Sequence, residues 1–365
     1  MTPSHGAGPG GRDGRGTGGE GVPDRGGATG QQPARRRVRV APSPHLHAPD
    51  STPRIMWTVN ATLVPVVGAA FWFFGLSALL VVGAATLGAV LVEAVFEEPA
   101  KIADGSAVIT GVLLGLTLPA SIPLWMAALG GAFGLGFGKL IFGGLGQNVF
   151  NPALLGRAFL QASFPTAITT WPALEGGWTR VYASNLALPF LTPPEVDATT
   201  SATPLGAMKF EGEVADLGPL LLGDTTGSLG ETAGLLILLC GAWLAWRNYL
   251  EWRIPAAIFA SVALLSGVLH LIDPAAYPGP MFMLFSGGLI LGAVYMATDL
   301  VTSPVTKRGA WIFGVGIGVI TVLIRLWGGL PEGVMYAILF MNALVPFIDR
   351  ATRPEVFGAA EGAAA

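Results

Sequence analysis

Runs of about twenty apolar residues recur from residue 57 onward, and they constrain the fold more than any other feature of this sequence. A helix needs about 20 residues to cross the hydrocarbon layer, where its backbone polar groups must be hydrogen-bonded within the segment. The chain is 52% hydrophobic and 12% charged, which is typical of a membrane protein. The runs predict an all-α polytopic membrane protein with about ten transmembrane helices, at 57–75, 76–96, 105–120, 122–141, 150–165, 231–247, 254–271, 281–298, 310–327 and 333–349.

Charged residues inside these runs are candidates for structural or transport roles, because an unpaired charge in the bilayer is costly. The fifth run, FNPALLGRAFLQASF, is short and contains Arg157. We therefore expect a partial or distorted helix there, packed against protein rather than lipid. Arg325 is also deep in a run, from which its side chain could extend to the interface. A cation path through Glu93 or Asp299 is a further hypothesis.

The ends of the chain differ in composition from the apolar runs. Residues 1–52 are rich in Gly, Pro and Arg and lack the apolar core of a secretory signal, which predicts a disordered tail. Residues 53–350 form the predicted transmembrane domain, interrupted by a long polar loop at about 166–230. Residues 351–365 are predicted to be a flexible tail.

The distribution of Lys and Arg predicts the orientation, because cytoplasmic connections accumulate these residues. The loop at about 166–230 contains only Arg180 and Lys209 as cations, beside many acidic residues. We therefore expect both termini in the cytoplasm and this loop outside it. The connections expected on the cytoplasmic side contain Lys101, Lys139, Arg247, Arg253, Lys307, Arg308, Arg350 and Arg353.

Two segments resemble each other and indicate an internal repeat. FGGLGQNVFNPALLGRAF at 142–159 is similar to WGGLPEGVMYAILFMNAL at 327–344, and each follows a glycine-rich run. The expected topology places the two GGL sequences on opposite sides of the membrane. This arrangement predicts two inverted five-helix repeats, whose interface is where such folds place their binding sites.

Cysteine and charge content exclude several function classes. Cys240 is the only cysteine in the sequence, so an internal disulfide is excluded and a thiolate metal site is not expected. The net charge of -3 gives no indication of nucleic-acid binding. Any redox chemistry would need an organic cofactor or partner subunits.

The sequence SATP in the long loop has a structural and a functional interpretation. Thr203 could cap a helix that has Pro204 at its first position. Alternatively, the small neighbours Ser201 and Ala202 would leave the Thr203 hydroxyl open to a bulky modification, such as esterification by the phosphate of a nucleotide.

The sequence GGLGQNVFNPALLGRAF also has two interpretations. Asn151, followed by Pro152, could cap a helix, and Arg157 could reach water or backbone carbonyls. Alternatively, the side chains of Asn148 and Asn151 could recognise a ring with several polar edges, such as a flavin. The residues alone leave both open.

Several motifs in this order resemble one family, RnfD/NqrB, which contains the D subunit of the Rnf electron-transport complex and the B subunit of the sodium-pumping NADH:quinone oxidoreductase. The similar segments span roughly residues 55–350: DGSAVITGVLLGLTLP, GGLGQNVFNPALLGRAF, SATPL, GSLGET, FSGGLILGAVYMATDLVTSPVTKRG and RLWGGLPEGVMYAILFMNALVPFID. The chain length, SATPL and the short acidic C-terminus favour the Rnf protein. The long N-terminal tail departs from its usual pattern.

The resemblance implies a cofactor and a biological role. In that family the last residue of the S-x-A-T motif carries FMN through a phosphoester bond made by a flavin transferase, which here implies Thr203, with Ser201 and Ala202 completing the motif. A noncovalent riboflavin is also implied, which we place near Asn148 and Asn151. The implied role is electron relay between ferredoxin and NAD+, coupled to Na+ or H+ transport. The implied setting is the bacterial inner membrane, with Rnf subunits A, B, C, E and G as partners.

Two alternatives remain at the level of sequence. One is the B subunit of a Na+-translocating NADH:quinone oxidoreductase, which belongs to the same family. The other is a cofactor-free transporter, in which inverted repeats form a midplane substrate site from broken helices.

Overall fold

The regular structure of the chain is helical wherever the structure describes it. The computed structural model describes residues 50–97, 103–172, 177–189, 202–223 and 225–354. No β-strand occurs in these ranges. Residues 1–49 and 355–365 of the predicted tails lie outside them and stay predictions, whereas the last helix extends to Thr352 and includes the first two residues of the predicted C-terminal tail.

Helix occurs at each of the ten apolar runs. The first five runs correspond to α1 (Thr52–Phe74), α2 (Leu76–Phe96), α4 (Ser106–Leu116), α5 (Leu124–Leu135) continued by the π-helical turn η1 (Gly136–Leu140), and α6 (Pro152–Ser163). The last five correspond to η3 (Glu231–Ala233) with α10 (Gly234–Trp246), α11 (Arg253–Ile272), α12 (Pro280–Phe285) with α13 (Leu289–Leu291) and the π-helical turn η4 (Gly292–Met296), α14 (Lys307–Trp327), and α15 (Val334–Thr352).

Five of the described helices are long and apolar enough to cross a membrane, namely α1, α2, α11, α14 and α15. Shorter apolar helices coincide with α4, α5 plus η1, and η3 plus α10. The remaining two runs form α6, which has only 12 residues, and the broken series from α12 to η4. Between the two sets lie the loop helices α7 (Pro165–Thr169), η2 (Ala183–Leu186), α8 (Pro204–Phe210) and α9 (Leu217–Leu222).

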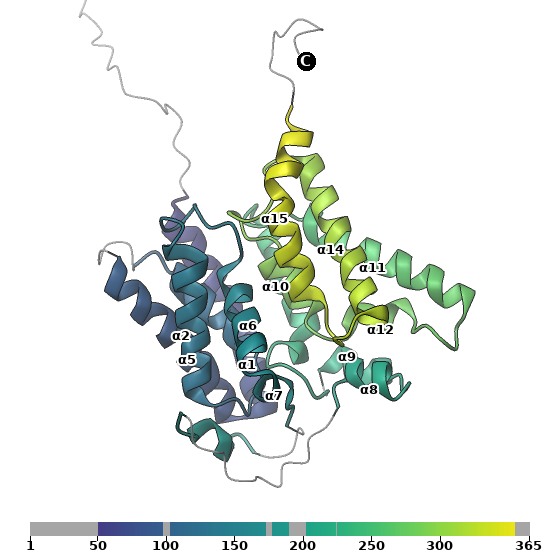
Figure 1. The fold of residues 1–365 in the computed structure, drawn as a ribbon, viewed down its shortest axis with the longest axis horizontal. Helices are drawn as coiled ribbons and strands as arrows, with labels where there is room; N and C mark the ends of the chain where they lie inside the picture. The colour runs from purple at the N-terminus through teal and green to yellow at the C-terminus, as the bar shows by residue number, and fades with distance from the viewer. Residues whose placement is uncertain (1–49, 98–102, 173–176, 190–201, 224, 355–365) are drawn as a thin grey trace, which may run out of the picture. The chain divides into compact units, whose positions relative to one another are not determined.

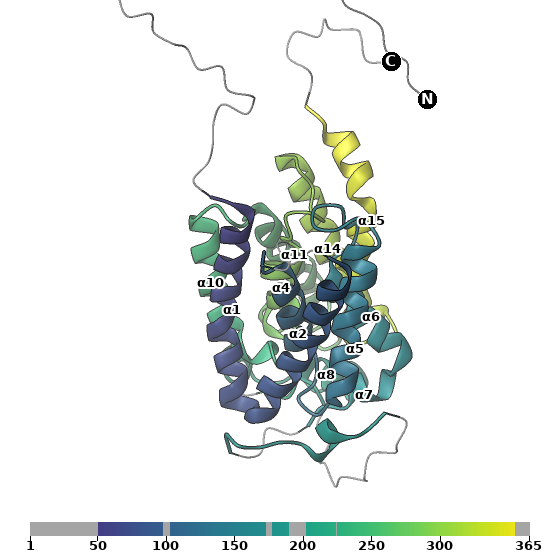
Figure 2. The ribbon, with the colours of Figure 1, turned by 90° about the vertical axis from the view of Figure 1, so that its left-hand side faces the viewer.

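Equivalent helices of the two expected halves form the closest pairs. α2 packs on α5, and α11 packs on α14 (Figure 1). Glycine makes both contacts close: a Cβ atom on Gly131 of α5 would lie 2.1 Å from the Ala85 carbonyl oxygen, and one on Gly314 of α14 would lie 2.6 Å from the Ala257 Cβ. α1 and α10, the first helices of the two sets, also lie side by side (Figure 2).

The glycines of α4 have the packing role that a G-x-x-x-G pair predicts. A Cβ atom on Gly111 would lie 2.2 Å from the Cα of Thr86, and one on Gly115 would lie 2.7 Å from the Cα of Val82. Both partners belong to α2. Side chains are therefore excluded at Gly111 and Gly115 by the backbone of the neighbouring helix.

Candidate functional site

Thr203 lines a cavity of about 570 Å³. Side chains from α6, α7, α8, η3 and α15 meet there, together with the loop that precedes α15. The apolar wall includes the aromatic rings of Trp171, Phe210 and Tyr336. Small-molecule sites typically have volumes of about 300–1,000 Å³ and apolar walls with a few polar groups, and this cavity fits that description.

The SATP sequence has the local structure that its capping interpretation predicts. Thr203 is the N-cap of α8, its Oγ accepts a hydrogen bond from the Gly206 amide at 3.1 Å, and Pro204 follows at the first helical position. Ala202 also lines the cavity, and its carbonyl accepts a hydrogen bond from the Thr226 hydroxyl at 3.3 Å. Ser201 lies outside the described residues.

Two contacts fix α8 against the second half of the chain. The helix break between α12 and α13 contains Gly287, whose φ is +68° and where a Cβ atom would lie 2.5 Å from Leu205 Cδ1. At the other end of α8, Lys209 Nζ donates to the carbonyls of Ile324, Arg325 and Leu330 at 3.0, 3.0 and 2.8 Å. Both contacts fix the position of Thr203.

Arg157 links the two halves beside Thr203. It lies on α6, where its Nη1 donates to the Thr117 carbonyl at 2.5 Å and its Nη2 to Glu332 Oε2 at 3.1 Å. The other oxygen of Glu332 accepts a hydrogen bond from the Gly288 amide at 2.5 Å. The expectation of a short helix packed against protein is confirmed, because α6 buries Arg157 among its neighbours.

A second acid and a second arginine lie near this pair. Glu231 lines the same cavity, and its Oε1 accepts a hydrogen bond from the Ser228 hydroxyl at 2.7 Å. Arg325 is fully buried, and its guanidinium donates to the carbonyls of Met283 and Ser286 at 2.5 and 2.9 Å. Arg325 therefore binds the C-terminal end of α12 and does not extend to an interface, which corrects that sequence interpretation.

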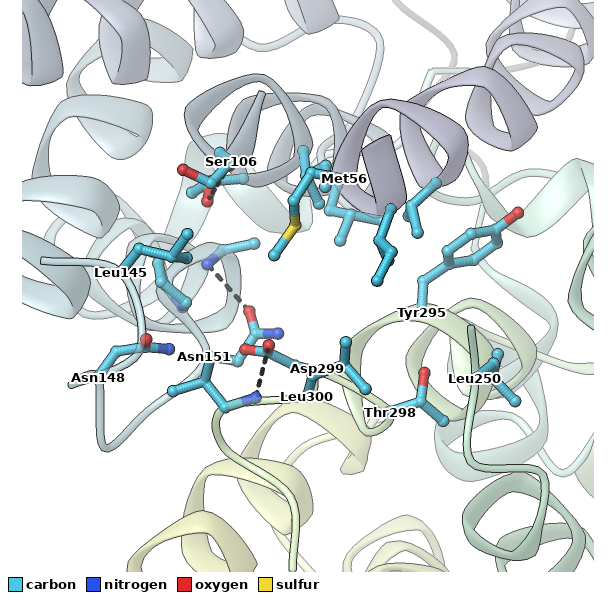
Figure 3. A pocket seen from close by; sticks show the side chains of 18 of the residues that line it. Met56, Ser106, Leu145, Asn148, Asn151, Leu250, Tyr295, Thr298, Asp299 and Leu300 are labelled. Atoms are coloured by element: carbon cyan, nitrogen blue, oxygen red, sulfur yellow. Dashed lines mark hydrogen bonds between the residues drawn. The ribbon is translucent and has the colours of Figure 1, made fainter. Parts of the chain in front are cut away.

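Asn148 and Asn151 lie together on a different and smaller cavity, of about 100 Å³ (Figure 3). Asn151 caps α6: its Oδ1 accepts hydrogen bonds from the amides of Ala153 and Leu154 at 3.0 and 3.2 Å. Its Nδ2 donates to the Met296 carbonyl at 3.2 Å. The capping interpretation is confirmed, and both polar atoms of this amide are used by the protein.

A buried ion pair lies beside this smaller cavity. Lys139, which lies in η1, donates hydrogen bonds to Glu93 Oε1 and, at 2.6 Å, to Ser106 Oγ. The side chains of Lys139 and Glu93 are only 5% and 0% exposed. The sequence interpretation counted Lys139 among the cations of cytoplasmic connections. Its side of the membrane stays a prediction, and the structure shows that this lysine pairs with a buried carboxylate. The Asp299 carboxylate accepts a hydrogen bond from the amide of Val301, two residues further along the chain, at 3.2 Å.

Sequence reasoning missed several residues of the Thr203 cavity. Glu332, Trp171 and Tyr336 were not singled out, because no local pattern indicates that they face the loop that contains Thr203. One signal was available for Glu332: the deep Arg157 needed an acidic partner, and the second copy of the GGL sequence carries a glutamate where the first has glutamine.

The chain is similar to known proteins along nearly its whole length. The D subunit of the proton-translocating ferredoxin:NAD(+) oxidoreductase complex of Clostridium ljungdahlii is 40% identical over 87% of this chain and 96% of the relative. The D subunit of the ion-translocating oxidoreductase complex of Stutzerimonas stutzeri is 40% identical over 84% and 92%. The D subunit of the Na(+)-translocating ferredoxin:NAD(+) oxidoreductase complex of Acetobacterium woodii is 37% identical over 88% and 95%.

The family model for NQR2, RnfD and RnfE matches residues 39–358, which include every helix described above. Together with these identities, the match confirms the resemblance that the motifs indicated. The chain therefore belongs to the NQR2, RnfD, RnfE family.

Proposed function

We propose that this chain is the membrane-bound D subunit of an ion-translocating ferredoxin:NAD+ oxidoreductase, that it carries FMN covalently on Thr203, and that it relays electrons in a process coupled to Na+ or H+ transport. One observation carries the proposal: Thr203 lines a cavity of about 570 Å³ whose lining includes the aromatic residues Trp171, Phe210 and Tyr336. The relatives that share this chain's length are subunits of such complexes.

The residues around Thr203 fit a covalently attached flavin. The cavity volume suits a tricyclic ring, and Trp171 and Tyr336 offer aromatic surfaces to it. Esterification of Thr203 Oγ would remove only the hydroxyl proton, so the oxygen could still accept the hydrogen bond from the Gly206 amide. FMN, when bound, would supply reversible one-electron chemistry.

The protein's own groups would position this cofactor and set the charge around it. Leu205 and Lys209 hold α8, and with it Thr203, against the second half of the chain. Arg157 is held at the cavity by the Thr117 carbonyl and by Glu332, so its positive charge is fixed before any ligand binds.

We further propose ten membrane crossings in two inverted five-helix repeats. Helix at each of the ten apolar runs supports this count, and the pairing of α2 with α5 and of α11 with α14 supports the repeat. In this arrangement, both termini are cytoplasmic and the Thr203 loop faces the outside of the bacterial inner membrane. Five of the helices reach spanning length, so the others would cross as shorter or broken segments packed among them.

The proposed partners are Rnf subunits A, B, C, E and G, with a flavin transferase required for attachment of FMN. Exposed apolar side chains on the long helices, such as Leu91 on α2 and Leu264 on α11, suit contact with lipid or with other membrane subunits.

A noncovalent riboflavin near Asn148 and Asn151 remains a proposal of its own. Both residues line one cavity, but its volume of about 100 Å³ is below the usual range for such ligands. Binding there would require the cavity to widen. Extraction of the purified protein with acid, followed by chromatography, would detect a riboflavin that is absent from an Asn148→Leu variant.

The covalent flavin has a direct test. The chain, coexpressed with a flavin transferase, is purified, denatured and run on a gel, and the band is examined for flavin fluorescence. We expect a fluorescent band for the wild type and a dark one for Thr203→Val. Thr169→Val is the matched control, because Thr169 lines the same cavity but donates to the Pro165 carbonyl within its own helix. A dark wild-type band would instead favour the cofactor-free transporter.

A further inference from the structure

Acidic residues outnumber basic ones in the described lining of the Thr203 cavity. Arg157 is the only basic residue among the described residues that line it, whereas Glu211, Glu231 and Glu332 are acidic. Arg325, buried behind the wall, interacts electrostatically with Glu231 and Glu332. An occupant that gains negative charge would therefore be repelled by the surrounding carboxylates unless a positive charge enters with it.

Both oxygens of Glu332 are occupied by hydrogen-bond donors. One oxygen accepts from the Gly288 amide and the other from the Arg157 guanidinium. Both partners can only donate hydrogen bonds, as a carboxylate requires. Glu332 therefore joins Arg157 of α6 to the break between α12 and α13.

Glu231 has a different kind of partner. Its Oε1 is 2.7 Å from the hydroxyl oxygen of Ser228. A serine hydroxyl can donate or accept, so this hydrogen bond can persist whether the Glu231 carboxyl is ionised or protonated. Burial favours the protonated form of Glu231 most strongly, and the neighbouring Glu332 carboxylate favours it as well. The Ser228 hydroxyl and backbone amide and the Arg157 guanidinium favour the ionised form.

We propose that Glu231 binds one proton when the flavin attached to Thr203 gains one electron, and releases it when that electron leaves. The inference rests on the proposed function. The electron comes from a one-electron reductant and the proton from a hydronium ion of the solvent at the cavity, whose O–H bond breaks as the O–H bond of the Glu231 carboxyl forms, leaving water. Both are returned on reoxidation. Among the described residues, the groups that face Glu231 are Ser228 in its own loop, Arg157 on α6, Glu332 before α15 and Arg325 on α14.

The test is a redox titration of the flavin in the purified, flavin-loaded protein at a series of pH values. For one proton per electron, we expect the midpoint potential of the wild type to fall by about 59 mV per pH unit, the value for a tenfold change in a one-electron couple. Glu231→Gln cannot exchange the proton, so its potential should be nearly independent of pH. Glu211→Gln is the matched control at an exposed position of the same cavity, and it should keep the wild-type slope.

Ser228→Ala provides a second variant that leaves the carboxyl in place. The Ser228 hydroxyl donates to the ionised Glu231 carboxyl. Without it, the pH range over which the midpoint potential varies should move to higher pH but should not disappear. A wild-type potential that does not depend on pH, a slope that persists in Glu231→Gln, or an unchanged range in Ser228→Ala would each overturn the inference. A polypeptide without fluorescence would instead overturn the proposed attachment of FMN, so the two failures are distinguishable.

Discussion

The cavity at Asn151 and the cavity at Thr203 both adjoin α6, yet their polar side chains are used differently. At the first, of about 100 Å³, Asn151 caps a helix and Lys139 neutralises Glu93, so the polar groups satisfy one another. At the second, Thr203 and Glu231 also accept hydrogen bonds from the protein, but they line a larger cavity of about 570 Å³. The two cavities therefore differ in the space beside their polar groups, and only the second has the volume typical of a small-molecule site.

The largest effect is expected at the Asn151 cavity, from a variant that removes the cation of the buried ion pair beside it. Lys139→Met would leave the buried Glu93 carboxylate without its partner, and breaking such a pair costs about 3–5 kcal/mol. We expect the unfolding temperature in detergent to fall sharply. Covalent flavin should remain on whatever protein folds, because this site is separate from Thr203.

The double variant Glu93→Gln, Lys139→Met tests whether the loss comes from the unpaired charge. It should recover most of the stability, because neither charge is then buried alone. If Lys139→Met alone were as stable as the wild type, the pair would not have the structural role assigned to it, and the contrast between the two cavities would be lost.

A smaller effect is expected where α8, which begins at the Thr203 cavity, packs against the break between α12 and α13. Gly287→Ala places a side chain at a φ of +68° and 2.5 Å from Leu205 Cδ1. Backbone strain of this kind costs about 1–3 kcal/mol. Because Leu205 belongs to α8, we expect less covalent flavin per polypeptide as well as lower stability.

Gly279→Ala is the control for this substitution. Gly279 has a φ of -67° and open space around a Cβ atom, so alanine should be tolerated there. Normal flavin loading in Gly287→Ala would show that the contact between α8 and the α12–α13 break does not position Thr203.

The smallest expected effect concerns Asn151. Asn151→Ala removes the N-cap of α6, at a typical cost of about 1 kcal/mol. Asn151→Asp keeps an acceptor for the amides of Ala153 and Leu154 and should restore much of that stability. If Asn151→Ala kept full stability and lost only a noncovalent flavin, Asn151 would be a ligand-binding residue rather than a cap.

The sequence predicted what depends on local pattern. Apolar runs located the helices, and the pairs Asn151–Pro152 and Thr203–Pro204 predicted helix starts that the structure confirms. These features depend on residues close together in the chain, where spacing and side-chain chemistry determine the hydrogen bonds.

What the sequence could not predict depends on distant partners. Arg157 and Glu332 are 175 positions apart, and local spacing does not show that their side chains meet. Lys139 was interpreted from the general distribution of cations, but Glu93, 46 positions away, determines its role. Arg325 would reach the interface in an isolated helix, whereas carbonyls freed at the end of α12 retain it inside.

Covalent attachment of a flavin to Thr203 can be tested by a mass spectrum of the peptide that contains this residue, from protein purified from its native host. We predict a mass increase equal to FMN less one water, which fragmentation assigns to the Thr203 side chain. An unmodified peptide, with no flavin nucleotide on any of its residues, would contradict the attachment.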